Sequence, residues 1–130
     1  MLISRSVLAD LLAHAVQDAP RECCGLLVGT AGSIVRSVRA RNLENGTTRY
    51  TIDPKDHFNA IRAARVDGLD VVGAYHSHPV SAASPSPTDL AEANSGADFV
   101  YVIVSVVNAD VRAFRIAAGH FEQVPLIPDP

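Results

Sequence analysis

Charged side chains are scarce in this chain, and no apolar run approaches the length of a membrane span. Charged residues make up 19% of the 130 residues and hydrophobic residues 48%, a balance that suits a sheet buried on both faces. The net charge of −3 and the pI near 5.9, without a cluster of Lys or Arg, argue against nucleic acid as a partner. The length predicts one domain over residues 1–130, and no membrane partner is expected.

No secretory leader is expected, and the chain has no cysteine framework. Asp10 interrupts the apolar stretch from Met1 to Ala15 and no cleavage-type site follows, so a cytoplasmic protein is expected. The two cysteines, Cys23 and Cys24, are adjacent and are therefore poorly placed to bond to each other. We expect both to be reduced and at least one to be buried. A thiolate metal ligand or a nucleophile is the alternative, which no Cys-x-x-Cys pattern supports.

The hydrophobic pattern predicts helices and strands in alternation. Apolar residues at Val7, Leu8, Leu11 and Leu12 form a helical stripe, whereas Phe99 to Val107 is the most strand-like run. The expected helices cover Ser4–Gln17, Asp53–Val66 and Pro87–Gly96. The expected strands cover Cys23–Thr30, Ser33–Arg41, Thr47–Ile52, Leu69–His78, Phe99–Val107 and Val111–Ala117, with a turn at Asn45–Gly46, and Phe121–Ile127 leads into a Pro-rich tail. This order describes an α/β (α+β) fold, a mixed β-sheet with helices packed against it.

The stretch from His76 to Asp89 carries the strongest chemical signal. His76 and His78 are two residues apart at the end of a predicted strand, so both side chains project from one face with Cα atoms about 6–7 Å apart. Pro79 stops the strand, and Ser86-Pro87 is a helix start with Ser as the N-cap. Asp89 then falls in the first turn of that helix, where a loop that folds back brings its carboxylate towards the imidazoles.

Two histidines and one carboxylate form the ligand set of a catalytic zinc site, with a fourth position left for water. Taken alone, His-x-His is weak evidence for a metal, and Ser86-x-x-Asp89 has the form of a capping box. Their adjacency across a short Pro/Ser loop favours one metal site made of His76, His78 and Asp89. His57, within the second predicted helix, is a weaker candidate for a further ligand.

The spacing His-x-His, seven residues, Ser, two residues, Asp resembles the signature of the JAMM (MPN+) zinc metalloproteases of the Mov34/MPN/PAD-1 family, and no part of that signature is missing. These proteins also carry a glutamate on an earlier strand, in a context similar to Pro20–Gly29, which points to Glu22. The resemblance implies the MPN fold, which is similar to the cytidine-deaminase architecture. A zinc deaminase itself is not expected, because the chain lacks His-x-Glu followed by Pro-Cys-x-x-Cys.

The resemblance implies a role for each residue of the signature. His76, His78 and Asp89 would hold one Zn²⁺ and a water, and Glu22 would act as general acid and base on that water. Ser86 would donate a hydrogen bond to the developing oxyanion; the alternative is a plain helix N-cap, and one hydroxyl can do both. Because sites of two histidines and a carboxylate accept several metals, iron or another ion stays an alternative to zinc.

The substrate is implied by the same resemblance. JAMM enzymes cut amide or isopeptide bonds next to the C-terminal Gly-Gly of ubiquitin or ubiquitin-like proteins, and this chain is too short to hold much of an insertion for reading ubiquitin chains. It resembles short stand-alone bacterial members that act on ubiquitin-like sulfur-carrier proteins, releasing an amino acid such as cysteine or a C-terminal extension. Two alternatives stay open, a non-catalytic MPN scaffold and a cell-wall or phage-tail peptidase. The oligomeric state, including a homo-oligomer, is also left open.

Overall fold

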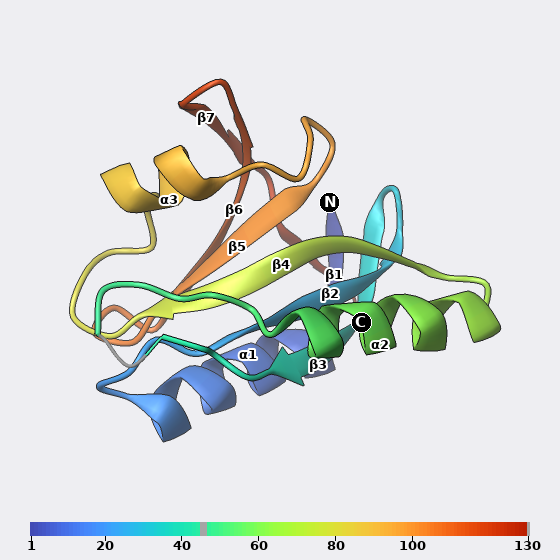
Figure 1. Ribbon diagram of the computed structural model, residues 1–130, viewed down its shortest axis with the longest axis horizontal. Coiled ribbons are helices and arrows are strands. Elements are labelled where there is room, and N and C mark those ends of the chain that lie inside the picture. The colour runs from blue at the N-terminus through green and yellow to red at the C-terminus, as the bar shows by residue number, and fades with distance from the viewer. Residues whose placement is uncertain (45–46, 130) are drawn as a thin grey trace.

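The structure, a computed structural model, describes residues 1–44 and 47–129. Figure 1 shows the strands crossing the molecule between the helices. The elements in chain order are β1 (Leu2–Ser4), α1 (Arg5–Asp18), β2 (Cys24–Thr30), β3 (Ser33–Ala40), α2 (Pro54–Val66), β4 (Asp70–His78), α3 (Pro87–Glu92), β5 (Val100–Ser105), β6 (Asp110–Ala117), β7 (His120–Val124) and β8 (Ile127–Asp129).

The strands of the described residues form one mixed sheet in the order β7-β6-β5-β4-β2-β3-β1-β8. Its central strand, β4, pairs antiparallel with β2 and parallel with β5. At one edge, β1 pairs parallel with both β3 and β8. The prediction of a mixed sheet with helices packed against it is therefore confirmed. β4 lies inside the sheet, with a paired strand on each side.

Alternation along β4 sorts its side chains between two differently covered faces. Tyr75 lies in a buried cluster with Leu11 of α1, so α1 covers one face. Ala74 lies in a separate cluster with Ala60 of α2, so α2 covers the opposite face. His76 is two residues beyond Ala74 and therefore projects to the α2 side, away from α1.

The helices begin close to where the sequence predicts. Asp53 caps α2 by accepting a hydrogen bond from the Lys55 amide, and Ser86 caps α3. The third helix is shorter than predicted, because it ends at Glu92 and Ala93 already has extended backbone. The weak helix formers Asn, Ser and Gly follow and do not extend it. None of the helices in residues 1–44 and 47–129 has both the length and the apolar character to cross a bilayer.

The predicted strand over Thr47–Ile52 is wrong. Ile52 alone makes a β-bridge there, with Asn42. The amide of the preceding residue, Thr51, donates to Asn42 Oδ1 at 3.0 Å instead of to a neighbouring strand. A side chain therefore interrupts the ladder that the β-forming residues favour. The predicted turn at Asn45–Gly46 lies outside the described residues.

Strands β1, β7 and β8 are not predicted by the sequence pattern. β1 and β8 have three residues each and pair with each other, which joins the two ends of the chain. A local pattern cannot reveal such a distant partner. β7 is exposed at four of its five positions, so it lacks the apolar alternation that marks a strand. The predicted tail from Phe121 onwards is wrong, because this part of the chain contains most of β7 and all of β8.

Gly25 of β2 lies where the backbone passes the ring of Tyr75. A Cβ at this position would overlap that ring and the carbonyl oxygen of Val38. We expect Gly25→Ala to lower the free energy of unfolding by about 1–3 kcal/mol, measured by urea denaturation. Gly32→Ala is the matched control, because a Cβ there meets nothing within 4 Å. Equal losses of stability in the two variants would contradict this steric explanation.

Candidate metal centre

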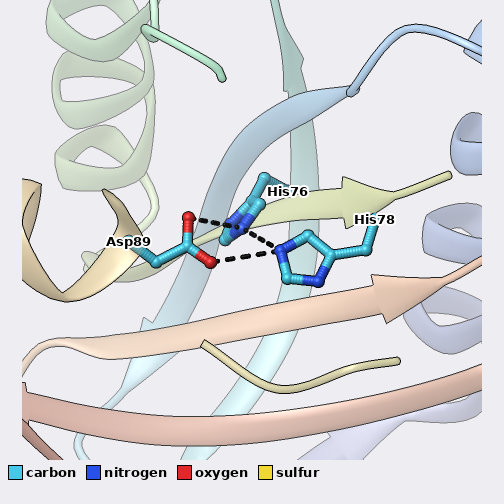
Figure 2. A group of neighbouring side chains, drawn as sticks. All are labelled: His76, His78 and Asp89. Carbon is cyan, nitrogen blue, oxygen red and sulfur yellow. Dashed lines mark hydrogen bonds and ion pairs between the residues drawn. The ribbon is translucent and has the colours of Figure 1, made fainter. Parts of the chain in front are cut away.

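Three side chains converge at the end of β4 (Figure 2). His76 Nε2 lies 3.2 Å from His78 Nε2 and 3.2 Å from Asp89 Oδ1, and His78 Nε2 lies 3.1 Å from Asp89 Oδ2. The histidines are 2% and 6% exposed, and the Asp89 side chain is 10% exposed. One ligand atom from each residue lies within 4.8 Å of the others. The structure thus brings together the three residues that the sequence predicts as ligands.

Strand β4 and the loop after it orient the two imidazoles. His76 pairs with Cys24 of β2 and with Ile103 of β5, so its backbone has a strand partner on each side. His78 Nδ1 lies 2.8 Å from the carbonyl oxygen of Ala82. Because a carbonyl only accepts, Nδ1 carries a proton, and in its neutral form the ring therefore presents an unprotonated Nε2 to the group. This is the tautomer that binds a metal through Nε2.

The start of α3 holds Asp89. Ser86 Oγ accepts a hydrogen bond from the Asp89 amide at 3.1 Å, and Asp89 Oδ2 accepts one from the Ser86 amide at 2.9 Å. This capping box fixes the carboxylate so that each of its oxygens faces one histidine. The N-cap prediction for Ser86 is confirmed, and its hydroxyl proton is still available to a further acceptor.

The protonation states within the group suit metal binding. Burial raises the pKa of Asp89, but hydrogen bonds with His76 and His78 outweigh it and hold that pKa well below its usual range. Burial lowers the pKa of His76. Burial also lowers the pKa of His78, yet its hydrogen bonds to Asp89 and the Ala82 carbonyl leave it above the ordinary value. A metal ion that replaces the proton between these residues finds an ionised carboxylate in place.

The spacing of the donor atoms fits a single tetrahedral ion. Two ligands bound about 2.0–2.1 Å from such an ion lie about 3.3 Å apart. The two imidazole nitrogens are 3.2 Å apart, and each lies 3.1–3.2 Å from a different oxygen of the Asp89 carboxylate, Oδ1 for His76 and Oδ2 for His78. Two imidazole nitrogens and a carboxylate also match zinc in ligand type and leave a fourth coordination position open. His76, His78 and Asp89 therefore could hold a metal ion.

Glu22 lies beside this group, just before β2. The β2–β4 register pairs Cys24 with His76, and two further residues bring Glu22 opposite His78. Its side chain is buried, and Oε1 has no hydrogen-bond partner among the described residues. Burial raises the pKa of Glu22 to about 7, while His78 lowers it and Asp89 raises it further. A buried carboxyl that titrates near neutral pH is suited to proton transfer.

A tyrosine and a cavity complete the surroundings, and no local sequence pattern signals either. The ring of Tyr50 stacks on that of His76, with centroids 4.2 Å apart and planes 17° apart. A cavity of about 290 Å³ opens beside Tyr50 and is lined in part by Leu26, Ala74 and Phe99. The cavity lies on the same face of the sheet as His76, and Tyr50 borders the cavity and stacks on that histidine.

Residues 4–117 match the family described as prokaryotic homologs of the JAB domain. The chain belongs to this family. A probable TtuB-protein conjugate cleaving protease of Thermus thermophilus is 32% identical over 129 residues, which cover 98% of this chain and 82% of the relative. A CysO-cysteine peptidase of Mycobacterium tuberculosis is 33% identical over 132 residues, which cover 97% of this chain and 89% of the relative.

A solved JAB1/MPN domain protein from Archaeoglobus fulgidus has the same fold, with a TM-score of 0.66, 22% identity, and coverage of 100% of this chain and 97% of that one. The predicted MPN-like fold is therefore confirmed. Membership of the JAB family confirms the resemblance to the JAMM metalloproteases, and relatives that are named as peptidases confirm the prediction of a JAMM-type hydrolase.

The other candidate residues lie outside the metal group of this JAB domain. His57 lines the cavity and is absent from the metal-binding group of the described residues. Ser77, which lies between the two histidines on β4, is not a candidate ligand, because it projects to the other face, where its Oγ accepts from the Cys23 amide at 2.8 Å. Cys23 and Cys24 are free and buried, as predicted. Burial raises the pKa values of their thiols to about 11 and about 12, so neither is a thiolate at neutral pH.

In the metal-free JAB domain, Glu22 should reduce stability at neutral pH. Its pKa of about 7 in the folded chain exceeds the reference value of 4.5, so between these values the folded state binds more protons and stability falls as pH rises. We expect Glu22→Gln to raise the free energy of unfolding by about 1–3 kcal/mol at about pH 8 and to leave it unchanged at about pH 4. Urea denaturation at both pH values tests this, and an equal effect at both would contradict it.

Proposed function

We propose that this protein is a zinc-dependent peptidase or isopeptidase that hydrolyses the amide bond after the C-terminal Gly-Gly of a ubiquitin-like sulfur-carrier protein. The group released is an amino acid such as cysteine or a C-terminal extension. The observation that carries the proposal is the buried convergence of His76, His78 and Asp89 at 3.1–3.2 Å beside Glu22. The names of two relatives, which mention TtuB conjugates and CysO-cysteine, support the substrate class.

His76, His78 and Asp89 would hold one Zn²⁺. When bound, the ion supplies Lewis acidity towards the scissile carbonyl and lowers the pKa of a coordinated water to about 7. The hydrogen bond from His78 Nδ1 to the Ala82 carbonyl and the capping box around Asp89 keep both side chains aimed at one point. These outer contacts would preserve the site when substrate enters.

Glu22 would carry the proton. In its ionised form it accepts a proton from the attacking water, and it then donates that proton to the leaving amine nitrogen as the C–N bond breaks. Its Oε1 is buried and has no hydrogen-bond partner in the described part of the chain, so it is free to do so. The pKa of about 7 in the metal-free chain leaves both protonation states accessible near neutral pH.

Ser86 would stabilise the oxyanion. Its Oγ accepts from the Asp89 amide at 3.1 Å, and this bond leaves the hydroxyl proton unused. The same bond holds the hydroxyl at the start of α3, close to the carboxylate of the metal group. A fixed donor beside the scissile carbonyl stabilises the charge that develops on its oxygen.

The low exposure of the site supports a Gly-Gly tail as substrate. The two histidines are 2% and 6% exposed, and Tyr50 covers one of them. A peptide whose last residues have no side chains can approach such a recessed group closely. The cavity lined by Leu26, Ala74 and Phe99 would receive residues that precede the glycines.

The test is intact-mass analysis of a purified sulfur-carrier protein that bears a cysteine or a short peptide after Gly-Gly. We expect the zinc-loaded protein to remove the extension after the second glycine, and a tail with Ala in place of that glycine to react at least about tenfold more slowly. A protein that holds one zinc and cleaves neither carrier would favour the scaffold alternative. Cleavage of a murein peptide in preference to the carrier would favour a cell-wall peptidase.

A further inference from the structure

The segment between β3 and α2 touches several parts of the metal centre. Its Tyr50 stacks on His76, and its Arg49 forms an ion pair with Glu92 of α3. At its start, the side chain of Asn42 reaches back to the residues that precede β2. The described residues of this segment therefore contact strand β4, helix α3 and the residues before β2, each of which supplies a residue of the site.

The side-chain amide of Asn42 uses all of its hydrogen-bonding groups. Nδ2 donates to the Glu22 carbonyl at 3.0 Å and, more weakly, to the Arg49 carbonyl at 3.4 Å. Oδ1 accepts from the amides of Glu44 at 2.9 Å and Thr51 at 3.0 Å. An amide with two donors and two acceptors engaged is held in one orientation.

Most of these bonds join distant parts of the chain. The bond to Glu44 spans two residues and has the form of an Asx turn. The bonds to Glu22 and Thr51 span 20 and 9 residues. Arg21 separately donates to the Glu44 carbonyl at 2.8 Å, so the segment has an anchor that does not depend on Asn42. The bond to Glu22 therefore ties this segment to the residue beside the metal group, in addition to the anchor from Arg21.

We propose that Asn42 is a positioning residue that fixes the main chain of Glu22 beside the metal group. Through the Thr51 amide, it also holds the adjacent Tyr50 ring on His76. The inference rests on the proposed function, in which Glu22 transfers the proton. A displacement of about 1 Å in such a group costs on the order of 10²-fold in rate. Because Asn42 acts through the main chain of Glu22, its loss should lower kcat more than it changes KM.

Two substitutions separate the two halves of the amide. Asn42→Ala removes its donors and its acceptors together. Asn42→Asp keeps oxygens that accept from Glu44 and Thr51 but cannot donate to the Glu22 carbonyl. Asn59→Ala is the matched control, because Asn59 is exposed on α2 and outside the site.

We expect both Asn42 variants to lower kcat about 10–100-fold, with KM within about threefold of wild type and zinc content unchanged. In metal-free protein without substrate, the ¹³C resonance of the Glu22 carbonyl should shift in both variants. Exchange of the Thr51 amide hydrogen should accelerate in Asn42→Ala and stay slow in Asn42→Asp. Asn59→Ala should match wild type in every measurement.

A wild-type kcat in both Asn42 variants, or an unshifted Glu22 carbonyl resonance, would overturn the inference. A loss of kcat that only tracks lost zinc or lost folding would overturn it too. If Asn42→Ala does not fold, Asn42→Asp carries the same test through the Glu22 resonance and kcat. If wild type cleaves no carrier conjugate, the proposed function fails, and the two NMR measurements still decide whether Asn42 fixes both segments.

Discussion

Glu22→Gln is expected to lower kcat on a carrier conjugate by about 10²–10⁴-fold while the protein keeps its metal. Glutamine preserves the size of the buried side chain but can neither accept nor return a proton. KM should change by no more than about threefold, because the substitution removes proton transfer and leaves the cavity intact. Steady-state kinetics with zinc quantified per chain measures both effects.

The matched control for this substitution is Glu122→Gln, at an exposed position of β7. It should retain wild-type kinetics and zinc content. Full activity in Glu22→Gln would exclude Glu22 as the acid and base. A loss of activity that only follows a loss of zinc would assign Glu22 to the integrity of the site instead of to the chemistry.

His76→Ala is expected to reduce bound zinc from one per chain to none and to make cleavage undetectable. The substitution removes one of three converging donors and also the ring on which Tyr50 stacks. A carboxylate and one imidazole bind zinc far more weakly than the full set. Metal analysis after dialysis and thermal unfolding with added zinc measure this, since a bound metal stabilises the folded state.

His120→Ala provides the comparison, because His120 is exposed at the start of β7. It should bind zinc and gain thermal stability from it as wild type does. Zinc that stays bound in His76→Ala with wild-type affinity would contradict the metal site. An equal loss of zinc in both variants would point to non-specific binding by surface histidines.

The site was predictable from sequence where its geometry is local. His76 and His78 share a face because they are two residues apart on a strand. Asp89 is oriented by a capping box, which the Ser86-x-x-Asp89 pattern predicts. The position of Glu22 could not be predicted from local spacing, because it depends on the register that pairs Cys24 of β2 with His76 of β4. The resemblance to a family supplied what the spacing could not.

The errors in predicting the fold also come from contacts between residues that are distant in sequence. The residues Thr47–Ile52 favour a strand, yet the Thr51 amide donates to the Asn42 side chain instead of to a neighbouring strand, so no β-ladder forms beyond a single bridge. No sequence pattern indicates that Tyr50 contacts His76, because the two residues are distant in sequence and Tyr50 lies outside any regular helix or strand. Both features depend on contacts between residues that are distant in sequence, which no periodicity encodes.

The most direct test of the central claim is to follow one carrier conjugate by intact mass with metal-stripped protein, before and after one equivalent of zinc is added. The account predicts no cleavage by the stripped protein, loss of the extension after Gly-Gly once zinc is restored, and no recovery in His76→Ala. Equal cleavage by stripped and zinc-loaded protein would contradict a metal centre built from His76, His78 and Asp89.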